Sequence, residues 1–253
     1  MNQNLLQSLR IVLIEPAGAL NVGSVARIMK NMGLKKLFLV KPHCDHLGQQ
    51  ARQMAVHAGD ILENAQIVQD ITTALAGCQR AIATTARPRA HTTLESPRLA
   101  LPWLLGENLP SALIFGPEDR GLSNTELNYA QRFVAIPSNP EYPSLNLAQA
   151  VAVCTYELYH ASLYPQEPKS SPVNIPSQPI QADTASLDIL EGYYQHLESV
   201  LLSIGYLYPH TASARMEKFR RLYHRANLTK EEVAMLRGIL RQVEWFISDQ
   251  KFP

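Results

Sequence analysis

The chain has 253 residues, of which 46% are hydrophobic and 18% charged. This composition excludes a disordered chain, and the length allows one large domain or a domain with an appendage. The formal net charge of +1 gives no global field that points to a nucleic-acid partner, so local basic patches would have to hold one.

Cysteine usage and the N-terminal sequence indicate a reducing compartment. The three cysteines, Cys44, Cys78 and Cys154, are far apart and form no CxxC pair, which argues against a disulfide framework. The N-terminus is polar and carries Arg10 directly before its first apolar run, so it does not resemble a signal peptide. No apolar run reaches the ~18 residues needed to span a bilayer. We expect a cytoplasmic protein that does not bind a membrane.

Short apolar runs bounded by turn residues predict five buried parallel strands, at residues 11–14, 37–40, 81–84, 112–115 and 133–136. Helix-like segments lie between and beside these runs, at residues 22–32, 51–64, 72–76 and 124–130. Strand and helix alternate along this part of the chain. The pattern therefore predicts an α/β domain over residues 1–162, with helices on both faces of a parallel sheet.

The C-terminal third has a different composition. Five prolines fall within residues 165–179, which predicts an extended linker over residues 163–182. Apolar residues then recur at helical spacing, which predicts a small all-helical extension over residues 183–253. The three expected stripes are Leu187, Leu190, Tyr194, Leu197, Leu201 and Ile204; Met216, Phe219 and Leu222; and Val233, Leu236, Leu240, Val243 and Ile247.

Polar loops follow three of the predicted strands. The first contains Asn21 and Arg27, the second reads GPEDRG from Gly116, and the third leads through Ser144 into an apolar helix. In a parallel sheet these loops meet at the carboxyl ends of the strands, where ligands bind. Taken alone, each loop fits a structural role better than a functional one, such as close packing at Gly23 and Gly33 or helix capping at Asn124. Three polar loops at one edge of the sheet together favour a site. GxGxxG and P-loop patterns are absent, so neither NAD nor ATP is indicated.

The segments NVGSVAR, IFGPEDRGL and IPSNPEYPSLNLAQAVAVCTYEL resemble the three motifs of the SPOUT class of RNA methyltransferases. Their order and spacing are similar to the TrmH-like branch, which methylates ribose 2′-hydroxyls, over residues 10 to about 160. The linker and helical tail resemble the TrmJ type, which acts on tRNA at cytidine or uridine 32 of the anticodon loop. The resemblance implies a homodimer and a deep trefoil knot in the C-terminal half of the α/β domain.

The resemblance also implies S-adenosylmethionine as cofactor and assigns its site. Backbone groups of the third motif would hold the cofactor, and the matching positions are Thr84, Thr85, Gly116, Ile136, Ser144, Leu145 and Asn146. Arg27 matches the family's candidate base, but a guanidinium has no acceptor, which favours a clamp on the target phosphate. Asn21, Glu118 and Ser144 would orient the ribose, Arg27 and the cofactor. No role is carried onto Asp119 or Arg120, and no metal is required.

RNA contacts are expected on a basic face of the tail. Residues 208–245 hold eight Lys or Arg and four Glu. The residues that fall opposite the Met216 stripe are Arg215, Lys218, Arg221 and Arg225. A solvated face and an RNA-binding face both fit this pattern. Further phosphate contacts near the cofactor site are expected from Lys35, Lys36, Arg87 and Arg89.

Three alternatives are weighed against tRNA methylation. His43, Cys44, Asp45 and His46 are metal-type side chains, but their crowding without a second cluster disfavours zinc. A methyltransferase of rRNA is disfavoured by the helical tail and by the lack of an N-terminal RNA-binding domain. A catalytically silent RNA-binding protein on the same scaffold would be favoured by loss of Asn21, Arg27 or Asn146, but all three residues are present.

Overall fold

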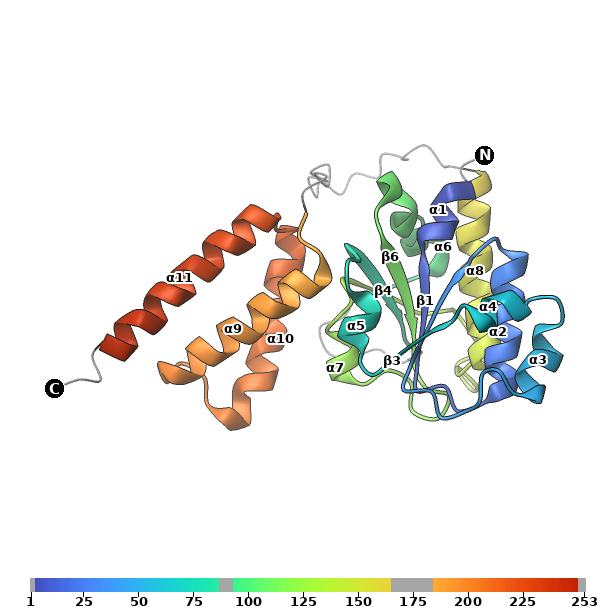
Figure 1. Cartoon of the computed structure of the whole chain (residues 1–253), viewed down its shortest axis with the longest axis horizontal. Coiled ribbons are helices and arrows are strands. Elements are labelled where there is room, and N and C mark those ends of the chain that lie inside the picture. Colours follow the sequence, from blue (N-terminus) through green and yellow to red (C-terminus); the bar gives the residue numbers. More distant parts are fainter. Residues whose placement is uncertain (1–2, 87–92, 165–183, 250–253) are drawn as a thin grey trace. The chain divides into compact units, whose positions relative to one another are not determined.

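The computed structural model describes residues 3–86, 93–164 and 184–249, which form two compact units, residues 1–171 and 172–253 (Figure 1). The linker expected at residues 163–182 lies outside the described residues from position 165 onward. The domain limits expected at residues 162 and 183 therefore stay predictions.

In the described part of the first unit, a seven-stranded sheet forms the centre, in the order β3-β2-β1-β6-β4-β7-β5, and neighbouring strands are parallel throughout. Val12 of β1 pairs with Phe38 of β2 on one side and with Ile114 of β6 on the other. The strands are β1 (Arg10–Ile14), β2 (Lys36–Val40), β3 (Gln66–Val68), β4 (Arg80–Thr84), β5 (Leu94–Glu95), β6 (Ser111–Phe115) and β7 (Arg132–Val134).

The sequence correctly predicted the five inner strands, because each carries a short apolar run; in β1, Ile11, Val12 and Leu13 have no exposed surface. It missed β3 and β5, which close the two edges of the sheet. β3 reads QIV and is mostly exposed, and β5 has only two residues. Neither strand carries the apolar run on which the prediction depended.

Helices cover both faces of the sheet. Figure 1 shows α2, α3, α4 and α8 on one side and α5 and α7 on the other. The helices of this unit are α1 (Gln3–Ser8), α2 (Ala19–Asn31), α3 (Gln49–Ala55), α4 (Gly59–Glu63), α5 (Ile71–Leu75), α6 (Pro97–Ala100), the 3-10 helix η1 (Leu101–Asn108), α7 (Asn124–Leu127) and α8 (Leu147–Leu163).

Two helix predictions were wrong in extent. The segment 51–64 is not one helix but two, because Val56 has a left-handed backbone with φ of 52° that ends α3. The helix expected to continue to residue 130 stops at Leu127, after a single capped turn.

Within residues 184–249, the second unit contains three helices: α9 (Leu187–Ser203), α10 (Pro209–Ala226) and α11 (Lys230–Asp249). The stripe of α9 is buried at Leu187, Leu190, Tyr194 and Leu197, as predicted. Two stripe residues are exposed, Ile204 by 48% of its surface and Leu222 by 49%. A salt bridge between Arg220 and the buried Glu191 joins α10 to α9 and replaces an apolar contact in this core.

None of the helices in the described part of the chain combines the length and the apolar content needed to cross a bilayer.

Helices α2 and α3 approach closely at Gly23. A Cβ atom at Gly23 would lie 2.1 Å from the carbonyl oxygen of Ala51, which is backbone and cannot rotate away. At Gly33, by contrast, nothing lies within 4 Å and φ is +72°, so that glycine serves a turn and not the packing expected for it.

Gly23→Ala is expected to lower the free energy of unfolding by about 1–3 kcal/mol, because the helices must move apart to admit the methyl group. Urea unfolding followed by circular dichroism measures this. The matched control is Gly59→Ala, where a Cβ meets nothing within 4 Å. Equal effects of the two substitutions would show that the α2–α3 contact does not limit stability.

Candidate active site

A cavity lies at the carboxyl ends of β4, β6 and β7. The space between its walls measures about 870 Å³, a figure that includes open solvent at its mouth. The residues that line it include six of the seven predicted cofactor positions: Thr84, Thr85, Gly116, Ile136, Ser144 and Leu145. Asn146, the seventh, does not line the cavity but caps the helix that follows it.

The wall of this cavity is mixed in polarity. Phe115, Leu122 and Val134 contribute apolar surface, while Ser144, Glu118 and the threonines contribute polar groups. The hydroxyl of Thr84 donates to the carbonyl oxygen of Ile114 at 3.1 Å, which fixes that side chain at the end of β4. Apolar walls with few polar groups suit an organic ligand that is oriented by hydrogen bonds.

The Glu118 carboxylate connects the second polar loop to the first. Its Oε2 accepts from the backbone N–H of Ala17 at 3.1 Å, and its Oε1 accepts from the N–H of Gly18 at 3.2 Å and from Nδ2 of Asn21 at 2.9 Å. Burial raises the pKa of Glu118, but the hydrogen bonds from Asn21 and from the backbone outweigh it, and the net pKa is below the usual value. Glu118 is therefore an ionised acceptor at neutral pH.

Asn21 extends this connection to the third loop. Its Oδ1 accepts from Nδ2 of Asn146 at 3.0 Å. Oδ1 of Asn146 in turn accepts from the N–H groups of Ala148 and Gln149 at the start of α8. The structure thus brings together residues from all three predicted motifs, in one chain of hydrogen bonds that runs from Glu118 to α8.

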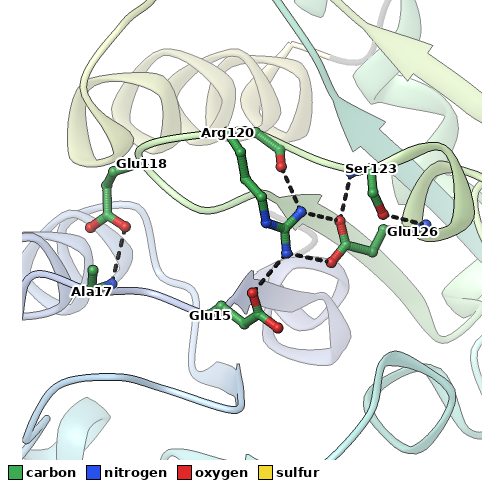
Figure 2. A network of polar contacts seen from close by, with 7 residues as sticks. Glu15, Ala17, Glu118, Arg120, Ser123 and Glu126 are labelled. Atoms are coloured by element: carbon green, nitrogen blue, oxygen red, sulfur yellow. Dashed lines mark hydrogen bonds and ion pairs between the residues drawn. The ribbon is translucent and has the colours of Figure 1, made fainter.

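A second connection between the loops is made by Arg120 (Figure 2). Its guanidinium contacts both oxygens of Glu126, at 2.9 and 3.0 Å, and donates to Glu15 at 2.7 Å. Glu126 also closes a capping box with Ser123 at the start of α7. The hydrogen bonds to Glu126 and Glu15 raise the pKa of Arg120 further above its usual value.

Arg120 was not predicted to have a role, yet it lines the cavity and fixes one of its walls. Ser123 and Glu126 were readable as a capping box, since they stand three residues apart at a helix start. The ion pairs of Arg120 with Glu126 and Glu15 were not predicted, and Glu15 lies 105 residues from Arg120 in the sequence.

Arg27 is exposed on α2 and does not line the cavity. It stands eight residues after Ala19, about 12 Å along the helix axis from the loop at the carboxyl edge, at ~1.5 Å per residue. The expected grouping of Arg27 with Asn21, Glu118 and Ser144 is therefore not found within one cavity of one chain.

Lys35 and Lys36 were expected near the cofactor site, and in their own chain they do not lie beside the cavity. Lys36 begins β2, so both lysines are at the amino ends of the strands, whereas the cavity is at the carboxyl ends. Each residue of β2 adds ~3.3 Å to the distance between the amino and carboxyl edges of the sheet. A contact of these exposed lysines with RNA stays a prediction, and Arg87 and Arg89 lie outside the described residues.

In the second unit, Arg215, Lys218 and Arg225 are exposed and Arg221 is partly buried. The local basic excess is smaller at the surface than the sequence suggests, because Arg220 is paired with Glu191. Over residues 3–86, 93–164 and 184–249, no three His, Cys, Asp or Glu side chains are grouped so as to hold a metal ion.

Comparison with known proteins adds to this geometry. The pattern of the SpoU rRNA Methylase family matches residues 8–156, and that of the C-terminal domain of the tRNA methyltransferase TrmJ matches residues 188–251. The chain belongs to the SpoU methylase family. The three polar loops that meet at the cavity all fall within the first match.

Similar proteins span both units of this SpoU family member. The tRNA (cytidine/uridine-2′-O-)-methyltransferase TrmJ of Klebsiella pneumoniae is 41% identical over 95% of this chain and 98% of its own. The crystal structure of TrmJ from Z. mobilis is 29% identical, covers 93% of this chain and 98% of that one, and has a TM-score of 0.79. A structure described as giving insights into the 2-OH methylation of C/U34 on tRNA is 26% identical, covers 62% of this chain and 97% of its own, and has a TM-score of 0.52.

Arg120→Ala is expected to lower the free energy of unfolding of this SpoU methylase by about 1 kcal/mol after solvent screening, because two ion pairs are lost together. The matched control is Arg98→Ala, which removes the pair with Glu157 from a side chain that is 68% exposed and is expected to change little. Denaturant unfolding of both variants measures the difference. If Arg120→Ala were as stable as Arg98→Ala, the ion pairs of Arg120 would not contribute to the stability of this wall of the cavity.

Proposed function

We propose that this chain transfers a methyl group from S-adenosylmethionine to the ribose 2′-hydroxyl of a cytidine or uridine in tRNA. The observation that carries the proposal is the cavity at the carboxyl ends of the strands, where the motifs of a SpoU methylase meet. The near full-length similarity to TrmJ tRNA methyltransferases supports tRNA as the substrate class. The target position we propose is 32 of the anticodon loop, with position 34 as the alternative that the C/U34 relative suggests.

The residues present suit the cofactor. Thr84, Thr85, Gly116, Ile136 and Leu145 would surround it, with the backbone near Ser144 beside them. The ionised Glu118 in the same wall suits a ligand that carries a sulfonium cation. S-adenosylmethionine bound there would supply the methyl group that is transferred to the ribose 2′-oxygen.

The polar residues of the site are assigned to orientation. Both oxygens of Glu118 already accept hydrogen bonds from Ala17, Gly18 and Asn21, so we assign it the role of holding the first loop and not that of proton acceptor. Asn21 passes this constraint to Asn146 and α8. Ser144, exposed in the wall of the cavity, is assigned to the ribose. Alignment of this kind contributes much of the rate in displacement reactions.

We further propose a homodimer in which Arg27 of one chain serves the cavity of the other and clamps the target phosphate. Two observations support it. Arg27 is exposed and absent from the cavity of its own chain. One stripe of α8 exposes large apolar side chains, with Val153, Tyr156 and Leu163 between 38% and 50% exposed, and a two-fold interface would cover such a stripe.

Two further features complete the proposal. The chain between β7 and α8 is proposed to be the crossing of a trefoil knot, as in the SPOUT class. The protein is also proposed to act on tRNA in the cytoplasm and to need no metal. Methylation of rRNA and a silent RNA-binding role are not favoured by any specific contact, and the match to the TrmJ C-terminal domain supports tRNA over rRNA.

The proposed activity is tested by transfer of radiolabelled methyl from S-adenosylmethionine to bulk tRNA, followed by nucleoside analysis. We expect label in 2′-O-methylcytidine or 2′-O-methyluridine. Label in rRNA and none in tRNA would show that rRNA, and not tRNA, is the substrate. Absence of cofactor binding in calorimetry would contradict the enzyme assignment altogether.

Arg27→Ala is expected to abolish methyl transfer while the fold and the cofactor affinity stay close to those of the unchanged protein, because Arg27 is remote from the cavity of its own chain. Single-turnover transfer and calorimetry with S-adenosylmethionine measure the two effects. Lys30, one turn further along α2 and paired with Asp60, gives the control Lys30→Ala, which is expected to retain activity. An active Arg27→Ala protein would remove Arg27 from the mechanism.

A further inference from the structure

The turn between α9 and α10 presents two tyrosines to solvent. Gly205, with φ of +73°, ends α9, and Leu207 then anchors the turn with only 1% of its surface exposed. Tyr206 is 53% exposed and Tyr208 is 55% exposed.

These rings are held in place by residues of α10. The guanidinium of Arg215 donates to the carbonyl oxygen of Tyr206 at 3.2 Å, and its carbon lies 5.8 Å from the centre of the Tyr206 ring. The Phe219 ring lies 6.5 Å from that of Tyr206, centre to centre. On the other side of Leu207, the rings of Tyr208 and His210 are nearly parallel, with an interplanar angle of 25° and centres 6.0 Å apart.

The charge around the turn distinguishes it from the other exposed apolar surface of this unit. Helix α10 carries five Lys or Arg and one Glu. Helix α11 exposes Trp245 and Phe246 as well, but carries three Lys or Arg against four Asp or Glu. Large exposed rings are thus combined with positive charge at the α9–α10 turn and not on α11.

Exposed rings beside cations suit single-stranded nucleic acid. Every base has a flat face that stacks on an aromatic side chain, and Arg or Lys beside the ring binds the adjoining phosphate. A polypeptide partner would not need the positive charge, and a double-stranded RNA would not offer its base faces.

We propose that the α9–α10 turn is a stacking site for unpaired bases of the RNA substrate, with Tyr206 and Tyr208 as the platform and Arg215 and Lys218 as phosphate contacts. This inference rests on the proposed function, and it assigns the recognition of unpaired loop bases to a segment outside the SpoU match. Of the expected basic face, Arg215 contacts the Tyr206 ring, and Lys218 stands three residues further along α10.

The test is the affinity of the full-length protein for labelled bulk tRNA, measured by fluorescence anisotropy at several salt concentrations. Tyr206→Ala is expected to raise Kd roughly 5- to 150-fold, the range for loss of one stacked base. Tyr206→Phe keeps the ring and is expected to retain affinity, whereas Tyr206→Leu keeps apolar bulk without a ring and is expected to lose it. Trp245→Ala, the matched exposed aromatic on α11, is expected to change nothing.

Salt dependence separates the two kinds of contact. Tyr206→Ala should leave the slope of log Kd against log salt unchanged, while Lys218→Ala should reduce its magnitude by about 1 for a lost phosphate contact. Circular dichroism and S-adenosylmethionine binding should be unaltered in every variant, because the substitutions are at the surface of the second unit.

Unchanged tRNA affinity in Tyr206→Ala, or full affinity in Tyr206→Leu, would overturn the proposal. A change in the oligomeric state of Tyr206→Ala, measured by analytical ultracentrifugation, would also overturn it, because the turn would then be a contact between copies of the chain. If the unchanged protein binds tRNA but transfers no methyl group, the proposed function fails while the stacking site is still judged by these affinities. Failure of the unchanged protein to bind tRNA would overturn both.

Discussion

The site depends on the ionised carboxylate of Glu118, because a carboxylate only accepts hydrogen bonds. Asn21 must therefore turn its amide nitrogen toward Glu118, which leaves its oxygen for Asn146. Asn146 must then donate to Asn21, which leaves its own oxygen for the first N–H groups of α8. The orientation of each amide follows from the one before it. A single charge thus sets the direction of a hydrogen-bond chain that joins three loops.

Arg120 complements this chain by acting on the other side of the same loop. Glu118 binds the backbone after β1, while Arg120 binds Glu15 at the end of β1, whose left-handed backbone with φ of 46° is uncommon for a residue other than glycine. The second loop is therefore attached to the first at two points, with opposite charges. Such a loop has little freedom left to lose when a ligand enters the cavity, which lowers the cost of binding.

The sequence predicted most of the sheet and the edge at which the site lies, but not its finer geometry. Buried strands such as β1 are continuous apolar runs and can be predicted from sequence. The edge strand β3 is mostly exposed and only three residues long, and it could not be predicted in this way. Six of the seven expected cofactor positions line one cavity, because parallel strands bring their carboxyl ends together. Lys35 and Lys36 lie at the edge opposite the cavity of their own chain, because β2 begins at Lys36 and runs toward the cavity edge. The ion pair of Arg120 with Glu15 depends on tertiary contact, which one sequence does not reveal.

The hydrogen-bond chain joins residues that are made at very different times. Asn21 is 97 residues before Glu118 and 125 residues before Asn146, and it bonds to both. A ribosome that has released only the first half of the domain has therefore exposed Asn21 without either partner, and no local segment contains the site. Contacts of such long range form late and slow the folding of a chain. During synthesis, the pocket cannot exist before α8 has emerged, so a prematurely terminated product would be inert even if its early strands had paired.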